Sequence, residues 1–368
     1  MSDQLLVSTR KGLFAVARGP LGWRVKSASF LGQNVTLALP VPGRGWFAAL
    51  NLGHFGVKLH HSTDEGRTWE ERAVPAYPAG ETVTLGDGKP PRPANLQMIW
   101  ALESGGPSQP GRMWAGTLPG GLFRSDDDGR SWELARGLWD RPERTRWFGG
   151  GYDVPGIHSF CVDPRDADVV RLAVSSGGVW RSEDGGRTWR VTSDGLRYAD
   201  NMGFPPELLG NPVTQDVHRM VQCPTSPDRM WIQHHCGVFR SDDGGLHWSE
   251  VRNVPPSVFG FAVAVHPRKA DVAYFVPAVK DECRVPVDAK LVVTRTGDAG
   301  RSFEVLRRGL PQEASYDLVY RHGLAIDEGG ERLAIGSTTG GLWVTEDEGA
   351  AWHGLAERLP PVHAVTFA

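Results

Sequence analysis

The stretch that decides the fold is "SDDGGLHW", residues 241–248, because copies of it recur along the chain. The copies are "STDEGRTW" (62–69), "SDDDGRSW" (125–132), "SEDGGRTW" (182–189) and the weaker "TGDAGRSF" (296–303) and "TEDEGAAW" (345–352). They share the pattern Ser/Thr-x-Asp-x-Gly-x-x-Trp/Phe, which we call the box. A short apolar run precedes each box and strand-like residues follow it. Each box is therefore predicted to be the turn of a β-hairpin.

The residues of the box are consistent with two interpretations, a calcium-binding loop or a structural turn. Interleaved aspartate and glycine are typical of the start of a calcium-binding loop. In a turn, however, the aspartate accepts hydrogen bonds from backbone N–H groups, the glycine adopts a positive φ and the tryptophan packs back onto the hairpin. A calcium loop also needs several more oxygen ligands and a closing bidentate glutamate, and the repeats lack both. We expect structural turns and no calcium at the boxes.

The recurring box resembles the Asp-box, or BNR, repeat of sialidases, xyloglucanases, sortilin-type receptors and photosystem II assembly factors. In those families the box joins the outer two strands of a β-propeller blade. The resemblance runs from residue 62 to residue 352, and it suggests a propeller of the BNR-repeat glycosyl hydrolase type. Repeats of about 40–50 residues with insertions fit such blades.

The predicted fold is all-β, a single seven-bladed β-propeller. The first unit has no inner strand of its own, and the C-terminal "PVHAVTFA" is predicted to supply it, so that the ring has no open edge. The predicted blades cover residues 1–30 with 361–368, 33–73, 94–136, 156–192, 216–252, 258–307 and 317–357.

Composition and the termini narrow the class of protein. The formal net charge is −3 and no segment concentrates Lys and Arg, so we expect no nucleic-acid partner. No apolar run is long enough to cross a bilayer. The N-terminal "MSDQLLVSTRKG" has no apolar core typical of a secretion signal, and the four cysteines form no CxxC pair. These features predict a cytoplasmic protein without a membrane partner.

The face opposite the boxes, which we call the mouth, is predicted to carry the functional site. All the long insertions fall on this face: 74–93, 137–155, 193–215 and 279–290. Aligned inner strands place four histidines at one level: His158, His218, His322 and His363. Neighbouring positions add Arg10, His54, Arg219, His234, His235, Lys280, Asp281 and Arg321.

These histidines also have two interpretations, packing between blades or binding of a ligand. Any one ring could simply pack between blades, with its nitrogens bonded to backbone groups. As a set, neutral imidazoles could ligate a transition metal, or protonated ones could hold a carboxylate or phosphate with Arg219 and Arg321. The set favours a site for a small anionic or metal-associated ligand, with the metal unknown.

Hydrolysis of a sugar-like substrate is the alternative function. A sialidase would need a tyrosine nucleophile and acidic partners, and the residues that could imitate them are Tyr152, Tyr316, Asp153, Asp216 and Asp317. The Phe/Tyr-Arg-Ile-Pro motif of sialidases is missing, and those enzymes have six blades. Xyloglucanases cleave between two propellers, and this chain is predicted to form one. A non-catalytic scaffold with a protein partner is the third hypothesis.

Overall fold

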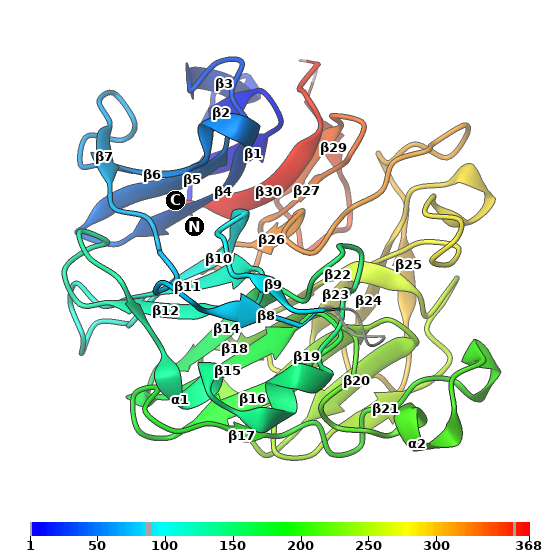
Figure 1. Ribbon diagram of the computed structural model, residues 1–368. Coiled ribbons are helices and arrows are strands. Elements are labelled where there is room, and N and C mark those ends of the chain that lie inside the picture. Colours follow the sequence, from blue (N-terminus) through cyan, green and yellow to red (C-terminus); the bar gives the residue numbers. More distant parts are fainter. Residues whose placement is uncertain (1, 85–89, 356–357) are drawn as a thin grey trace.

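The computed structural model describes residues 2–84, 90–355 and 358–368, and these form seven four-stranded antiparallel sheets arranged in a ring (Figure 1). Each sheet is one blade. The predicted all-β, seven-bladed propeller is therefore confirmed. Residues 85–89 of the insertion 74–93, residues 356–357 of the seventh predicted blade and Met1 of the first lie outside the described residues.

The blades follow one another in chain order, and the strands of each blade run from the inside of the ring to its rim. Blade one is β30 (Val362–Phe367), β1 (Gln4–Thr9), β2 (Gly12–Gly19) and β3 (Gly22–Ser29). Blade two is β4 (Val35–Val41), β5 (Gly45–Asn51), β6 (Val57–Ser62) and β7 (Glu70–Arg72). Blade three is β10 (Met98–Ser104), β11 (Met113–Leu118), β12 (Leu122–Ser125) and β13 (Glu133–Leu134). Blade four is β14 (Ile157–Asp163), β15 (Asp166–Val174), β16 (Gly178–Ser182) and β17 (Arg190–Val191).

The remaining blades have the same order. Blade five is β18 (Val217–Cys223), β19 (Ser226–His234), β20 (Gly237–Ser241) and β21 (Ser249–Val251). Blade six is β22 (Gly260–Val265), β23 (Ala273–Pro277), β24 (Val293–Thr296) and β25 (Glu304–Leu306). Blade seven is β26 (Leu324–Ile326), β27 (Leu333–Gly336), β28 (Leu342–Thr345) and β29 (His353–Gly354). The mouth insertions add the short pair β8 (Thr82–Val83) and β9 (Arg92–Pro93) and the one-turn helices α1 (Arg136–Trp139) and α2 (Pro206–Leu209).

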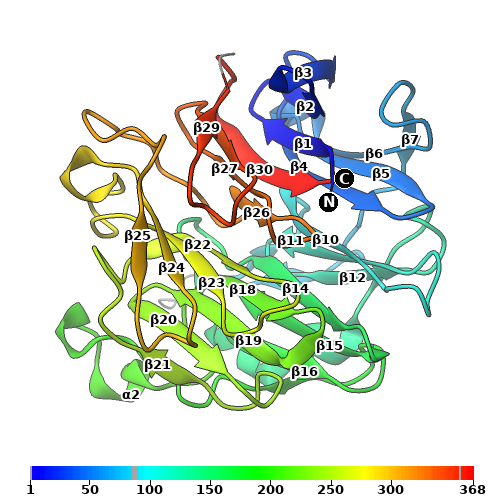
Figure 2. The ribbon, with the colours of Figure 1, turned by 180° about the vertical axis from the view of Figure 1, so that it is seen from behind.

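The C-terminal strand closes the ring, as predicted. β30 pairs antiparallel with β1, with Leu5 opposite Phe367 and Val7 opposite Val365. Figures 1 and 2 show β30 in red beside β1 in blue, with the two chain ends close together. Val362 and Val365 are buried against blade seven. The closure therefore satisfies the backbone edge of β1 and completes an apolar interface at the same time.

The core lies between the blades. Each of the seven interfaces between adjacent blades holds an apolar cluster of buried side chains. Trp114, Trp180 and Trp231 are among the largest fully buried side chains. In the described part of the chain, no helix combines the length and the apolar character that a membrane span needs.

The boxes are the turns between the third and fourth strands of their blades. In the turn between β20 and β21, the Ser241 hydroxyl donates to Asp243 Oδ1 (2.8 Å) and accepts from the Gly245 N–H (2.9 Å). The backbone N–H groups of Leu246 and His247 donate to the same Asp243 oxygen (3.1 and 3.0 Å). The aspartate is thus occupied by donors of its own turn, which is what a structural role requires.

Candidate functional site

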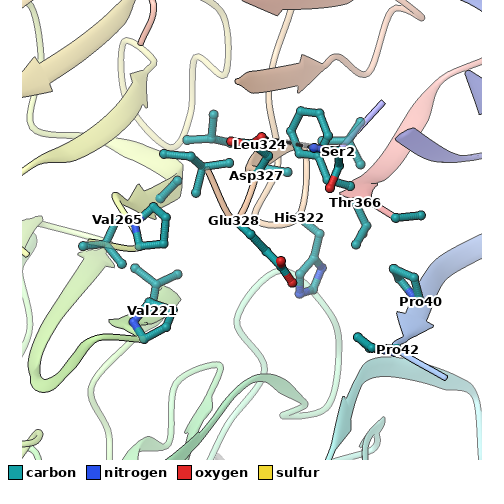
Figure 3. A pocket seen from close by; sticks show the side chains of 18 of the residues that line it. Ser2, Pro40, Pro42, Val221, Val265, His322, Leu324, Asp327, Glu328 and Thr366 are labelled. Carbon is teal, nitrogen blue, oxygen red and sulfur yellow. Dashed lines mark hydrogen bonds between the residues drawn. The ribbon is translucent and has the colours of Figure 1, made fainter. Parts of the chain in front are cut away.

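Two cavities lie at the centre of the ring, and His322 lines both. One, of about 720 Å³, opens on the box side, where the turns between first and second strands contribute Pro42, Pro224 and Glu328. Figure 3 shows Pro42 and Glu328 in this cavity. The other, of about 380 Å³, opens on the mouth, where the turn between β19 and β20 contributes His235. Strands alternate in direction across a blade, so these two sets of turns lie on opposite faces.

The smaller cavity is the better candidate site, although it has the lesser volume. The box-side cavity is lined mainly by prolines and aliphatic side chains, including Val221, Val265 and Leu324 (Figure 3). The mouth cavity brings together acidic, basic, imidazole and aromatic side chains from most of the blades. A binding site is marked by a few convergent polar groups in a concave setting, and the mouth cavity has them.

An acid–imidazole cluster forms one wall of the mouth cavity. Asp216 Oδ2 lies 3.3 Å from His235 Nδ1 and 3.9 Å from His218 Nε2. The other ring nitrogen of His218, Nδ1, donates to the Gly260 carbonyl oxygen (2.6 Å), and the ring stacks on Phe261 with centroids 4.3 Å apart. Because Nδ1 carries the proton, Nε2 of a neutral His218 presents its lone pair to the cluster.

The backbone fixes the spacing of this cluster. Asp216 comes directly before β18, and His218 is the second residue of that strand. His235 lies in the turn between β19 and β20, and its backbone N–H donates to the Asp216 carbonyl oxygen (3.0 Å). The three side chains therefore come from one blade and are tied together by its first and second strands.

Burial and charge set the protonation of the cluster. Burial alone would raise the pKa of Asp216, but His218, His235 and Arg321 outweigh it and hold that pKa well below its usual range. Burial lowers the pKa of His218 to about 3, so this ring is neutral at pH 7. For His235, burial acts to lower the pKa, but the hydrogen bond and charge of Asp216 outweigh it and the pKa is raised.

A buried arginine lies in the same cavity. The Arg321 guanidinium lies 4.9 Å from the ring centre of Trp100 and 5.4 Å from that of Phe261, and the residue is only 9% exposed. Burial lowers the pKa of Arg321, with Asp216 acting in the opposite direction, but an arginine stays charged in proteins. Within the described residues Arg321 makes no ion pair, and its Nε has no hydrogen-bond partner. The cavity thus holds a fixed positive charge that is not neutralised by direct contact.

Other predicted residues also line the mouth cavity. Asp281 forms an ion pair with Arg284, and Tyr152 packs edge-on against Trp100 with ring centroids 5.1 Å apart. His363 is hydrogen-bonded to the Asn34 side chain (2.8 Å). The mouth cavity therefore gathers Tyr152, Asp216, His218, His235, Asp281, Arg321, His322 and His363 from the residues that the sequence singled out.

Three of the predicted histidines are packed between neighbouring groups, although Nε2 of His158 and of His234 has no hydrogen-bond partner in the described residues. His158 is fully buried beside Trp100, and His234 is fully buried between Tyr198 and Phe239. His322 Nε2 donates to the carbonyl oxygen of His158 in blade four (2.8 Å). Burial lowers the pKa of His158 well below its ordinary value and those of His234 and His322 to about 3. These rings are neutral at pH 7 and supply no positive charge for an anion.

The remaining predicted residues do not line the mouth cavity. Arg219 lines the box-side cavity instead, and Asp317 accepts hydrogen bonds from the hydroxyls of Ser315 and Ser337 in a turn of blade seven. Five others are exposed outside the cavity: Arg10, His54, Asp153, Lys280 and Tyr316. The second and third blades also supply lining residues that the histidine pattern missed, namely Asn34, Thr36, Asn51, Met98 and Trp100.

A simple signal could have found some of these missed residues. "NVT" (34–36) and "MIW" (98–100) open the inner strands of blades two and three, as "DVH" (216–218) opens that of blade five. Aligning them puts Thr36 and Trp100 at the level of His218, and Asn34 at the level of Asp216. The alignment fails to show Arg284 and Asn51, because they belong to turns and strand ends rather than to the inner strands.

Comparison with known proteins supports a propeller of the BNR type. No family model matches the chain. The chain is 27% identical over 163 residues to a sialidase from Bacteroides fragilis, a match that covers 38% of this chain and 29% of the sialidase. It is 27% identical over 156 residues to a xyloglucanase from a Paenibacillus species, covering 39% of this chain and 13% of the xyloglucanase. The matches thus span less than a third of each of these two relatives.

Solved structures share the fold. An ancestral GH74 enzyme superimposes with a TM-score of 0.56 at 17% sequence identity, over 88% of this chain and 38% of that one. The protein YCF48 bound to D1 peptide superimposes with a TM-score of 0.50 at 13% identity, over 88% of this chain and 86% of that one. At such low identity these likenesses speak for the fold alone, and function must be argued from the site.

Proposed function

We propose that the protein binds a small carboxylate-bearing ligand in the mouth cavity, with Arg321 as the recognition residue. The observation that carries the proposal is the buried guanidinium of Arg321, held between Trp100 and Phe261 without an ion-pair partner in the described chain. A buried charge is costly unless it is paired, and a guanidinium binds a carboxylate through two parallel hydrogen bonds. The cavity volume of about 380 Å³ suits a ligand of metabolite or monosaccharide size.

The aromatic lining favours a ligand that also has a flat apolar face. Trp100, Tyr152, Phe261 and Tyr320 all border the cavity. Such rings stack on the C–H face of a sugar or on a planar acid, while the polar groups fix its orientation. A sugar acid combines both features and is a ligand class consistent with the similarity to a sialidase.

Binding without turnover is the function that these carboxylates support best. Glycoside hydrolysis requires a carboxylic acid whose pKa is raised so that it can protonate the leaving group. Asp216 has its pKa lowered instead, Asp281 is engaged by Arg284, and neither Asp153 nor Asp317 lines the cavity. We therefore place hydrolysis of a sugar-like substrate second and a protein-binding scaffold third.

Calorimetric titration tests the proposal. The probes are glucuronate, citrate and malonate, with glucose as a neutral control and inorganic phosphate as a different anion. We expect saturable binding of at least one carboxylate and none of glucose. Arg321→Lys keeps the charge but loses the paired donors. Loss of a hydrogen bond to a charged group costs about 1.5–3 kcal/mol, so affinity should fall roughly 10- to 150-fold.

The matched control is Arg219→Lys, since Arg219 borders the other cavity and should leave the affinity unchanged. Equal affinity of the wild type and Arg321→Lys would overturn the proposal, as would the absence of binding for every carboxylate. Release of nitrophenol from a nitrophenyl sialoside or nitrophenyl glucoside would favour hydrolysis over binding without turnover.

A further inference from the structure

We propose that Asp216, His218 and His235 form a binding site for a divalent transition-metal ion. This metal site goes beyond the proposed carboxylate ligand. It lies in the same cavity but rests on other side chains, so either proposal can fail alone.

The positions of the ligand atoms carry the proposal. One atom from each of the three side chains lies within 4.8 Å of the others, and Asp216 Oδ2 is 3.3 Å from His235 Nδ1 and 3.9 Å from His218 Nε2. Metal bonds of roughly 2.0–2.2 Å hold two ligands of one ion about 3–3.5 Å apart. Side-chain shifts of about 1 Å would bring the three atoms to the spacing of ligands on one ion.

The cluster is also organised in the way that metal ligands are. A histidine ligand usually donates its second ring N–H to a backbone carbonyl or a carboxylate, which fixes the tautomer and the ring orientation. His218 donates from Nδ1 to the Gly260 carbonyl oxygen and is stacked on Phe261, so Nε2 is the free ligand atom. This second contact comes from blade six, outside the blade that supplies the three ligands.

The second carboxylate oxygen of Asp216, Oδ1, provides an independent observation. Its Oδ1 is buried and has no hydrogen-bond partner in the described residues. A protonated His235 would be a counter-ion for Oδ2 only, and it would leave Oδ1 unsatisfied. An unpaired buried carboxylate oxygen is unfavourable, and a divalent cation bound by both carboxylate oxygens of Asp216 would satisfy it.

The donor set selects the kind of metal. Two imidazoles and one carboxylate suit Zn²⁺, Fe²⁺, Mn²⁺ or Co²⁺, whereas Ca²⁺ and Mg²⁺ prefer oxygen ligands throughout. Three protein ligands leave coordination positions open, and all three side chains border the mouth cavity. A carboxylate on Arg321 would share that cavity with the ion.

Metal titration of the full chain tests the site. The protein is stripped with a chelator, dialysed, and titrated with Zn²⁺ by calorimetry and with Co²⁺ by visible absorption. We expect one tight equivalent and a Co²⁺ spectrum that indicates nitrogen ligation. Asp216→Asn and His235→Gln should each weaken binding by at least about 100-fold, because even partners outside the ligand shell change affinity 10- to 100-fold.

Two control variants separate this site from other histidines. His363→Gln alters the same cavity at a ring held by Asn34, and His247→Ala removes an exposed imidazole beside Asp243; both should bind the metal as the wild type does. His235 lies in a turn, so His235→Gln should keep the fold, as circular dichroism would verify. Arg321→Lys should keep the metal even if it loses the carboxylate. A wild-type protein without saturable binding, or folded Asp216→Asn and His235→Gln variants with wild-type affinity, would overturn the proposal.

Discussion

Replacing Asp243 by alanine tests whether a box is a structural turn. The change removes the acceptor for the Ser241 hydroxyl and for the N–H groups of Leu246 and His247. Each such hydrogen bond contributes about 0.5–1.5 kcal/mol, and the two backbone donors are exposed enough to bind water instead. The expected loss of unfolding free energy is therefore about 1–3 kcal/mol. An unfolding entropy of about 2.1 cal/mol/K per residue over 368 residues turns this into a Tm roughly 1–4 °C lower.

Calorimetric melting at pH 7 measures the difference, and the neighbouring residue offers the control. Asp242 is exposed and pairs with Arg229 and Arg240 on the surface, so Asp242→Ala should cost less than about 1 kcal/mol. Asp243→Asn keeps one acceptor oxygen, so its Tm should lie between those of Asp243→Ala and Asp242→Ala. A Tm of Asp243→Ala equal to that of Asp242→Ala would refute the structural role, as would calcium that raises the wild-type Tm but not that of Asp243→Ala.

Two further outcomes follow from the ring and its buried histidines. Deleting residues 361–368 removes β30 and exposes the edge of β1 and the apolar side chains of blade seven that Val362 and Val365 cover. The protein should then aggregate or expand, as measured by size-exclusion chromatography, and a monomer of unchanged stability would contradict the closure. Burial lowers the pKa of His322 to about 3, below its value of about 6.5 in the unfolded chain. The unfolded chain therefore binds the proton more readily, and the free energy of unfolding decreases as the pH falls from about 6.5 to about 3. The stability of the wild type should fall by about 1.4 kcal/mol per pH unit more steeply than that of His322→Gln over this range, and parallel curves would refute this assignment.

The fold could be predicted because its signals are local and repeated. A box such as "SDDGGLHW" contains its own donors and acceptors, so its structure depends little on distant residues. Six copies make the period visible, and the missing inner strand of blade one can be matched only to the unused C-terminal strand. The repeat therefore allowed the pairing of β30 with β1 to be predicted, although the two strands lie at opposite ends of the sequence.

The roles of individual histidines could not be predicted in the same way, because they depend on the neighbouring blade. His158 and His218 occupy equivalent strand positions. The ring of His158 is fully buried beside Trp100 of blade three, whereas His218 meets Phe261 of blade six and faces Asp216. The pattern within one strand gives the level of a side chain. The residue across the interface decides which groups it faces, because both rings are buried.

The mouth cavity contains two opposite charges that each lack a full partner. In the described chain, Asp216 lies beside the imidazoles of His235 and His218 and has one oxygen without a hydrogen-bond partner, and Arg321 is held over Trp100 and Phe261 without an ion pair. If stability alone were at stake, a direct Asp–Arg pair or two apolar residues would be less costly. The structure instead holds Asp216 beside two imidazoles and Arg321 over two aromatic rings. Two charges without a direct ion pair between them are what a site needs if a cation is to bind at Asp216 and a carboxylate at Arg321.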